Sequence, residues 1–386
     1  MRYRKLGRWG LRVSEISLGS WLTFGTAVDD DRAARIVRRA LDLGVNLFDT
    51  ANVYGQGRAE EVLGRALAGV DRSSYVVATK VFGEMGPGPN DRGLARKHVV
   101  EQCDASLRRL GVERIDLYQC HRDDPEVPLE ELCRTMDDLI RWGKVLYWGV
   151  SEWEPARIED AVRLCEREGL HPPVSDQPRY SMLERGIEEA VLPTCRALGL
   201  GAIVFSPLAQ GVLTGKYRRR GEIPPGSRAA RQATRGFVQR FLTPEILARV
   251  ERLRAVAAEA GLTLGQLALA WVLRRPEVAS AIVGATDPRQ LEENVGASGW
   301  SWGRTSWPGS RPPWPEGRYP ARWIRPAFRQ LAQTFTRRGV PSTMARTRCT
   351  FGSHRRFVRR WEWDTRIPKN GRFPQMSQTA AMAPRC

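Results

Sequence analysis

The sequence predicts an α/β protein whose main part is a (β/α)8 barrel, and three observations lead to this prediction. Short apolar and β-branched runs alternate with segments of helical periodicity over residues 1–299. There are eight such runs. The GxGxxG turn that an open dinucleotide-binding sheet needs after its first strand is absent. Eight strands with covering helices in about 300 residues fit a closed barrel better than an open sheet.

The strands can be placed in chain order. Before them, residues 3–13 contain Gly7 and Gly10 and predict a hairpin that plugs the bottom of the barrel. The predicted strands are Ile16–Gly19, Val45–Phe48, Tyr75–Lys80, Ile115–His121, Val145–Val150, Pro173–Gln177, Gly201–Pro207 and Ala279–Gly284.

The segments between these strands have the spacing of amphipathic helices. Two apolar stripes illustrate it: Ala33, Ile36, Val37, Ala40 and Leu41 in one segment, and Leu129, Leu132, Met136, Leu139 and Ile140 in another. Gly44 is placed for a left-handed helix end, Thr243-Pro244 for a helix start, and Thr263 with Gln266 for a capping box.

Charge is distributed unevenly along the chain. The net charge is +18, and residues 300–386 carry 15 of these charges, together with 7 of the 13 tryptophans and 10 of the 25 prolines. These residues fit neither helical nor strand periodicity. We therefore expect a barrel domain over residues 1–299 and a basic, irregular, disordered tail over residues 300–386.

Composition excludes several classes of protein. A hydrophobic fraction of 42% excludes disorder throughout. No apolar run approaches the roughly 20 residues of a membrane helix, and no apolar segment follows the basic N-terminus, so we expect a cytoplasmic protein without a membrane partner. Seven cysteines without CxxC pairs, and four histidines without ligand spacing, predict neither a disulfide framework nor a metal site. No evolved nucleic-acid partner is expected, and a homo-oligomer is left open.

Four residues whose side chains could take part in catalysis lie at or just after the carboxyl ends of neighbouring strands. They are Asp49, Tyr54, Lys80 and His121. Barrel enzymes carry their active sites at this end. A lysine beside a tyrosine lowers the pKa of the phenol from about 10, and a carboxylate holds the ammonium in place. We therefore expect Tyr54 to act as a general acid and His121 to orient a carbonyl, which suits reduction of a C=O bond once a hydride source is present.

Several motifs resemble those of the aldo-keto reductase superfamily. They are NLFDTANVYG at 46–55, ATK at 78–80, DLYQCH at 116–121 and YWGVS at 147–151. Within the superfamily, YRKLG at 3–7, RGLARKH at 92–98 and SPLA at 206–209 most resemble the branch of potassium-channel β subunits and their bacterial relatives. The resemblance implies an NADPH-dependent carbonyl reductase with the tetrad Asp49, Tyr54, Lys80 and His121. The alternative is an NADP(H)-binding regulatory subunit with little or no catalysis.

The same resemblance implies a set of cofactor contacts for NADP(H). Ser151 and Gln177 would contact the nicotinamide carboxamide, and Ser206, Leu208 and Gly211 the pyrophosphate. Lys216 and Arg228 would bind the 2′-phosphate. The adenosine end would be formed by Gly284, Thr286, Gln290, Glu293 and Asn294, and further contacts would come from Ser20, Trp21 and Asp49. The helix start after Gly284 is also placed to bind an anion or to be an ordinary capped helix, and Trp21 and Trp148 are candidates for the wall of a carbonyl-substrate pocket.

The resemblance ends near Gly299, where the family continues into an acidic amphipathic helix. A frameshift accounts for the change. With GC-rich codons for residues 300–318, a reading frame one base earlier encodes VELGEDELARIEAALAGRP, which has the pattern of an amphipathic helix. The alternative is an evolved basic arm for nucleic acid or a membrane surface.

Overall fold

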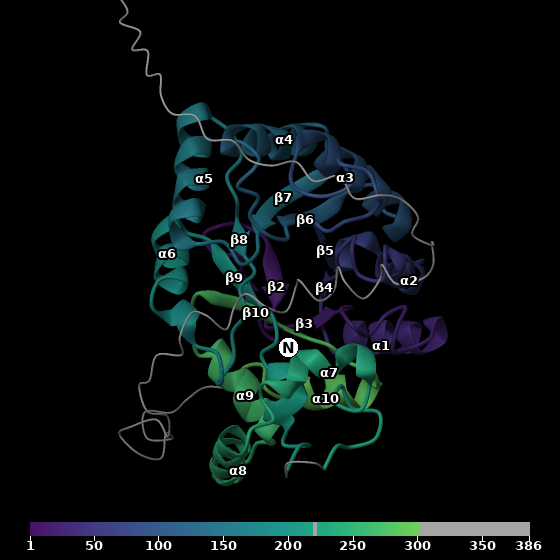
Figure 1. Ribbon diagram of the computed structural model, residues 1–386, viewed down its shortest axis with the longest axis vertical. Coiled ribbons are helices and arrows are strands. Elements are labelled where there is room, and N and C mark those ends of the chain that lie inside the picture. Colours follow the sequence, from purple (N-terminus) through teal and green to yellow (C-terminus); the bar gives the residue numbers. More distant parts are fainter. Residues whose placement is uncertain (219–221, 301–386) are drawn as a thin grey trace, which may run out of the picture. The chain divides into compact units, whose positions relative to one another are not determined.

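The computed structural model describes residues 1–218 and 222–300, where the eight predicted strands form a closed parallel barrel (Figure 1). In barrel order the strands are β3 (Ile16–Gly19), β4 (Leu47–Asp49), β5 (Val76–Val81), β6 (Ile115–Cys120), β7 (Val145–Val150), β8 (Ser175–Asp176), β9 (Gly201–Val204) and β10 (Val278–Val283). β10 pairs in parallel with both β3 and β9, which closes the barrel. The predicted (β/α)8 TIM barrel is confirmed, and each predicted strand overlaps an observed one.

Helices surround the strands (Figure 1). They are α1 (Asp30–Asp42), α2 (Arg58–Leu67), α3 (Arg96–Leu110), α4 (Leu129–Arg141), α5 (Pro155–Glu168), α6 (Val191–Leu198), α7 (Gln232–Gln239), α8 (Pro244–Glu259), α9 (Leu264–Leu273) and α10 (Pro288–Val295). Short 3₁₀ turns are η1 (Arg72–Ser74), η2 (Gly186–Glu188) and η3 (Ala209–Thr214). The predicted capping box is present at α9, where the Thr263 hydroxyl and the Gln266 amide each accept from the other residue's backbone N–H.

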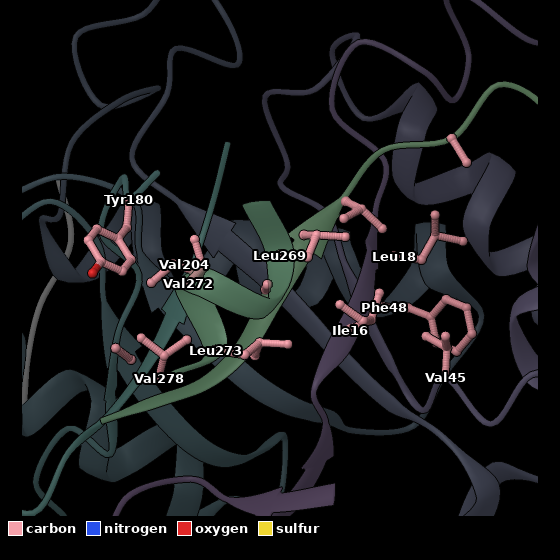
Figure 2. Close-up of a cluster of buried hydrophobic side chains, with 14 of the residues drawn as sticks. Ile16, Leu18, Val45, Phe48, Tyr180, Val204, Leu269, Val272, Leu273 and Val278 are labelled. Atoms are coloured by element: carbon pink, nitrogen blue, oxygen red, sulfur yellow. The ribbon is translucent and has the colours of Figure 1, made fainter. Parts of the chain in front are cut away.

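The core has an outer and an inner layer, because successive strand side chains point to opposite faces. Outward side chains such as Ile16, Leu18, Phe48 and Val204 pack in the layer beneath the helices. Figure 2 shows part of this layer, with Leu269, Val272 and Leu273 of α9 near Val204 and Val278. Inward side chains form a second cluster in the barrel interior: Leu47, Val76, Ala78, Leu117, Val174, Ile203, Ala279 and Ile282.

The N-terminal hairpin closes the bottom of this inner cluster. β1 (Tyr3–Lys5) and β2 (Arg12–Ser14) pair in antiparallel fashion, and Leu6 and Val13 join the interior cluster. The Gly7 backbone lies so close to the residues before β9 that a Cβ there would be 2.2 Å from the carbonyl oxygen of Gly199. The predicted plug is thus observed.

The described part of the chain ends beside its own beginning. One oxygen of the Glu15 carboxylate pairs with Arg4, and the other accepts hydrogen bonds from the Ser298 hydroxyl at 2.9 Å and the Gly299 backbone at 2.8 Å.

The predicted irregular tail lies, from residue 301 onward, outside the described residues. In residues 1–218 and 222–300, no single helix is long and apolar enough to cross a membrane, although α8 and α9, bent by 86°, pass that test together on length and composition alone.

Candidate active site

The carboxyl ends of β4, β5 and β6 bring three of the four predicted catalytic residues to the barrel interior. Asp49 is the last residue of β4, Lys80 lies near the end of β5, and His121 directly follows β6. Tyr54 enters from the loop between β4 and α2. The Lys80 side chain is fully buried and that of Asp49 is 5% exposed, so the ion pair between them is shielded from water.

Lys80 joins the other members of this group. Its Nζ donates to Asp49 Oδ1 at 2.6 Å and to the backbone carbonyl of Thr50 at 2.8 Å, and it lies 3.3 Å from the Tyr54 hydroxyl. An ammonium has three N–H donors, so these three partners use its full capacity. The lysine therefore has a fixed position, and its charge lies next to the phenol oxygen.

Burial controls the protonation of Tyr54. Burial raises the pKa of the phenol, and this effect outweighs the lowering by the nearby Lys80 charge. The prediction that Lys80 lowers the net pKa of Tyr54 below its ordinary value is therefore wrong for this structure, because the sequence did not reveal how far the surrounding residues shield the partly buried phenol from water. Lys80 itself has a raised pKa, since its interactions with Asp49 and Tyr54 more than offset the burial of its charge. Tyr54 is thus a protonated phenol beside a permanent cation.

His121 completes the group on the side of β6. Its ring lies edge-on to the Tyr54 ring, with centroids 5.6 Å apart. Burial, and then the charges of Lys80 and Arg122, hold the pKa of His121 well below its ordinary value. The imidazole is therefore neutral near pH 7 and can donate one hydrogen bond from its N–H group.

Two glutamines lie beside Asp49. The amide of Gln177 donates to Asp49 Oδ2 at 2.8 Å and to Gln119 Oε1 at 3.3 Å, and the Ser151 hydroxyl donates to the Gln177 backbone carbonyl at 2.8 Å. Ser151 and Gln177 were predicted as site residues, but Gln119 was not. Gln119 lies on β6, two residues before His121 in the extended chain, so both face the interior. This alternation is the signal that could have identified Gln119. Its amide nitrogen is buried and has no hydrogen-bond partner in the described part of the chain.

The predicted phosphate-binding residues form a cationic cradle above the end of β9. A Cβ at Gly211 would lie 3.2 Å from Lys216 Nζ, and a Cβ at Gly284 would lie 3.5 Å from a terminal nitrogen of Arg228. No carboxylate within residues 1–218 and 222–300 forms an ion pair with either cation. Partial burial, and then the charge of Arg228, lower the pKa of Lys216. Two converging, unneutralised cations over bare glycine backbone fit a phosphorylated dinucleotide.

The remaining predicted contacts lie around this cradle. Trp21 packs edge-on against Phe237 of α7 at 4.9 Å, and the Arg228 guanidinium lies 6.0 Å from its ring centre. The Ser20 hydroxyl donates to Thr50 Oγ1 at 2.8 Å, and Leu208 is the N-cap residue directly before η3. Sequence reasoning missed Phe237, because it belongs to a helix outside the repeated βα pattern.

At the start of α10, for which the sequence allowed either an anion site or an ordinary capped helix, side chains bind the backbone N–H groups. The Asp287 side chain caps the helix by accepting from the Arg289 backbone, and the Gln290 side chain accepts from the Thr286 backbone at 2.9 Å. These two backbone donors therefore have partners within the chain, as in an ordinary capped helix. Glu293 and Asn294 lie further along α10, where Glu293 is exposed and Asn294 is buried.

Trp148 does not line the substrate pocket, contrary to that prediction. Its side chain is fully buried under the helices, and its indole nitrogen donates to the His171 carbonyl oxygen at 2.7 Å. It lies on the outward face of β7, one residue out of phase with the inward face.

Among the described residues, no three His, Cys, Asp or Glu side chains gather closely enough to hold a metal ion.

Comparison with known proteins identifies the family of this chain. The aldo/keto reductase family matches residues 15–300, which include the whole barrel. The chain belongs to the aldo/keto reductase family. Members of this family generally bind NAD(P)H and act on small carbonyl compounds.

Two similar proteins are named as ion-channel subunits rather than as enzymes. A "probable voltage-gated potassium channel subunit beta" of Arabidopsis thaliana is 45% identical over 300 residues, which cover 77% of this chain and 91% of that protein. A protein of the same name from Oryza sativa subsp. japonica is 44% identical over 300 residues, with the same coverage. The resemblance to this branch, first noted from the motifs, is thereby confirmed.

Proposed function

We propose that this aldo/keto reductase is an NADPH-dependent enzyme that reduces aldehydes or ketones to alcohols, with Tyr54 as the proton donor. The observation that carries the proposal is the position of Lys80, whose ammonium contacts both Asp49 and the Tyr54 hydroxyl. Such an arrangement has little value for binding alone, because burying a lysine is costly unless its charge is paired and used.

In this mechanism each residue has one task. The protonated Tyr54 donates its proton to the carbonyl oxygen of the substrate, and Lys80 stabilises the phenolate that remains. Asp49 holds the ammonium in place, and the neutral His121 donates a hydrogen bond that orients the carbonyl oxygen. NADPH, when bound, would supply the hydride for the carbonyl carbon, so that one carbonyl compound, one NADPH and one proton would give one alcohol and one NADP⁺.

The cradle around Lys216 and Arg228 supports NADPH rather than NADH. Only NADPH carries the 2′-phosphate that can accept charge-assisted hydrogen bonds from both cations. Such bonds contribute about 1.5 to 3 kcal/mol each, so we expect a preference above about tenfold. Fluorescence titration of the two reduced cofactors measures it directly. Equal dissociation constants for NADPH and NADH would contradict this assignment.

The cysteines bear on the proposed compartment. The five described cysteines, Cys103, Cys120, Cys133, Cys165 and Cys195, are buried free thiols. Thiols without disulfide partners are usual in reducing compartments, which supports the proposed location in the cytoplasm.

A regulatory subunit of the channel type is the second candidate function, and the names of the relatives favour it. In that case the barrel would bind NADP(H) and report its redox state to a partner. His121 favours the enzyme, because a neutral imidazole beside Tyr54 completes the group needed for proton transfer.

Steady-state consumption of NADPH separates the two functions. The purified chain is mixed with NADPH and a panel of aromatic and short aliphatic aldehydes. Multiple turnovers with at least one aldehyde, with formation of the matching alcohol, support the enzyme. Tight binding of NADPH without turnover on the whole panel supports the regulatory subunit.

A further inference from the structure

The loop after β9 has an unusual backbone. Ser206, Ala209 and Gln210 have positive φ angles of 57°, 46° and 60°, and Gly211 follows with 91°. A left-handed conformation is unfavourable for a residue other than glycine, and such residues cluster at functional sites. Gln210 is therefore held in a costly conformation directly beside the cationic cradle, and the cost must be offset by what this conformation positions.

The contacts of the Gln210 side chain show what it positions. Its amide nitrogen donates to the Ser206 hydroxyl at 2.6 Å, and its amide oxygen accepts from the Arg228 guanidinium. The residue is only 5% exposed. One side chain thus connects Ser206, near the start of the loop, with the cation that lies near Gly284.

The chemistry of this connection is specific. Arginine side chains in a protein interior are usually held by carboxylates, which neutralise them. Arg228 is held by a neutral amide instead, and no carboxylate of the described residues pairs with it. An amide fixes the direction of the guanidinium and leaves its charge available for an incoming anion.

We propose that Gln210 is a positioning residue that holds Arg228 in place for the 2′-phosphate of the dinucleotide and thereby sets the preference for NADPH over NADH. This inference rests on the proposed function, because it takes the cradle to be the cofactor site. It goes further by giving a role to a side chain that neither the motifs nor the family assignment singled out.

Three variants test the role of the amide. Gln210→Asn keeps an amide and tolerates the left-handed conformation, but it is one methylene too short to contact Ser206 and Arg228 together. Gln210→Glu reaches both groups and neutralises Arg228. Gln210→Gly tolerates the backbone conformation best and removes the side chain, so it is the alternative if Gln210→Asn does not fold.

The measurement is the dissociation constant of NADPH and of NADH, from fluorescence titration of the full chain, with thermal unfolding as a check on folding. We expect Gln210→Asn to weaken NADPH binding about tenfold, the value of one hydrogen bond to a charged group, and NADH binding less than about threefold. Gln210→Glu should weaken NADPH binding at least as much. In an Arg228→Ala background, Gln210→Asn should have no further effect on NADPH.

The outcomes separate this inference from the proposed function. If the unaltered chain binds NADPH tightly but Gln210→Asn weakens both cofactors equally, Gln210 only supports the loop and the inference is overturned. The same holds if Gln210→Asn changes neither constant. If the unaltered chain binds neither cofactor, the proposed function fails and the inference fails with it.

Discussion

Lys80 carries a full charge at a place that excludes water, and its neighbours explain how the charge is tolerated. Asp49 supplies the counter-charge, and the Thr50 carbonyl and the Tyr54 hydroxyl take the remaining N–H groups. Burial alone would favour the neutral amine, so the raised pKa of Lys80 depends on Asp49. Replacement of Asp49 by asparagine would therefore disturb both the charge and the position of the group that faces Tyr54.

A pH profile tests the protonation states of the site. The pKa of Tyr54 is raised, so its proton-donor form persists to alkaline pH and is lost only above about pH 10, the ordinary phenol value. The pKa of His121 is lowered well below its ordinary value, so the imidazole does not change charge near neutrality. We expect kcat/KM for an aldehyde to be flat between about pH 6.5 and 10 and to fall only above that range. A clear inflection near pH 6.5 that disappears in His121→Asn would show that His121 titrates there, contrary to this account.

At the scale of the elements, the fit of the N-terminal hairpin against the rest of the barrel depends on one glycine. Gly7 has φ +63°, and a Cβ there would meet backbone atoms of Gly199, Leu200 and Gly201 at 2.2 to 2.7 Å. These backbone atoms belong to the link between α6 and β9 and to the first residue of β9, and they cannot move aside as a flexible side chain could. Gly10, in the same hairpin, has open space around it.

These two glycines form a matched pair for a stability test. Gly7→Ala should lower the free energy of unfolding by at least about 2 kcal/mol, because the left-handed conformation and the backbone clash both count against it. Gly10→Ala should change it by less than about 0.5 kcal/mol. Chemical denaturation of both variants checks this. Equal losses for the two would mean that the hairpin does not lie against β9 as described.

Much of this architecture could be predicted, for a physical reason. A buried parallel strand needs an apolar run, and a covering helix needs an apolar stripe, so both leave local patterns such as Ile115–Cys120 and the Ala33 stripe. Side-chain contacts that depend on barrel closure leave no such pattern. Gln119 and Gln210 were missed for this reason, and the direction of the Tyr54 pKa was wrong because burial is a property of the whole fold.

At the scale of the whole molecule, Glu15 joins the beginning of the chain to the end of its described part. The carboxylate binds Arg4 from the N-terminal hairpin and Ser298 and Gly299 from the segment after α10. Burial opposes its charge, but the Gly299 N–H, Arg4 and Ser298 outweigh it and lower the pKa of Glu15. This contribution to stability is present above the ordinary carboxyl pKa and is lost as the pH falls through the lowered value.

A chain that ends at residue 300 should therefore behave as a complete barrel. Removal of residues 301–386 takes away 15 of the 18 net positive charges. We expect the shortened chain to unfold cooperatively within about 3 °C of the full chain, and to lose any salt-sensitive binding to nucleic acid of arbitrary sequence. Thermal unfolding and binding assays at two salt concentrations measure both. Loss of cooperative unfolding would show that the barrel requires the removed residues.

Proton donation by Tyr54 during carbonyl reduction can be followed in a single-turnover experiment. The preformed complex of the full chain with NADPH is mixed rapidly with an aldehyde that the steady-state panel has selected, and the nicotinamide absorbance is followed for the unaltered chain and for Tyr54→Phe. We predict rapid oxidation of NADPH in the unaltered chain and a rate roughly 10² to 10⁴ times lower in Tyr54→Phe, the usual contribution of a general acid, with unchanged affinity for NADPH. Equal rates of NADPH oxidation in the two proteins would contradict proton donation by Tyr54.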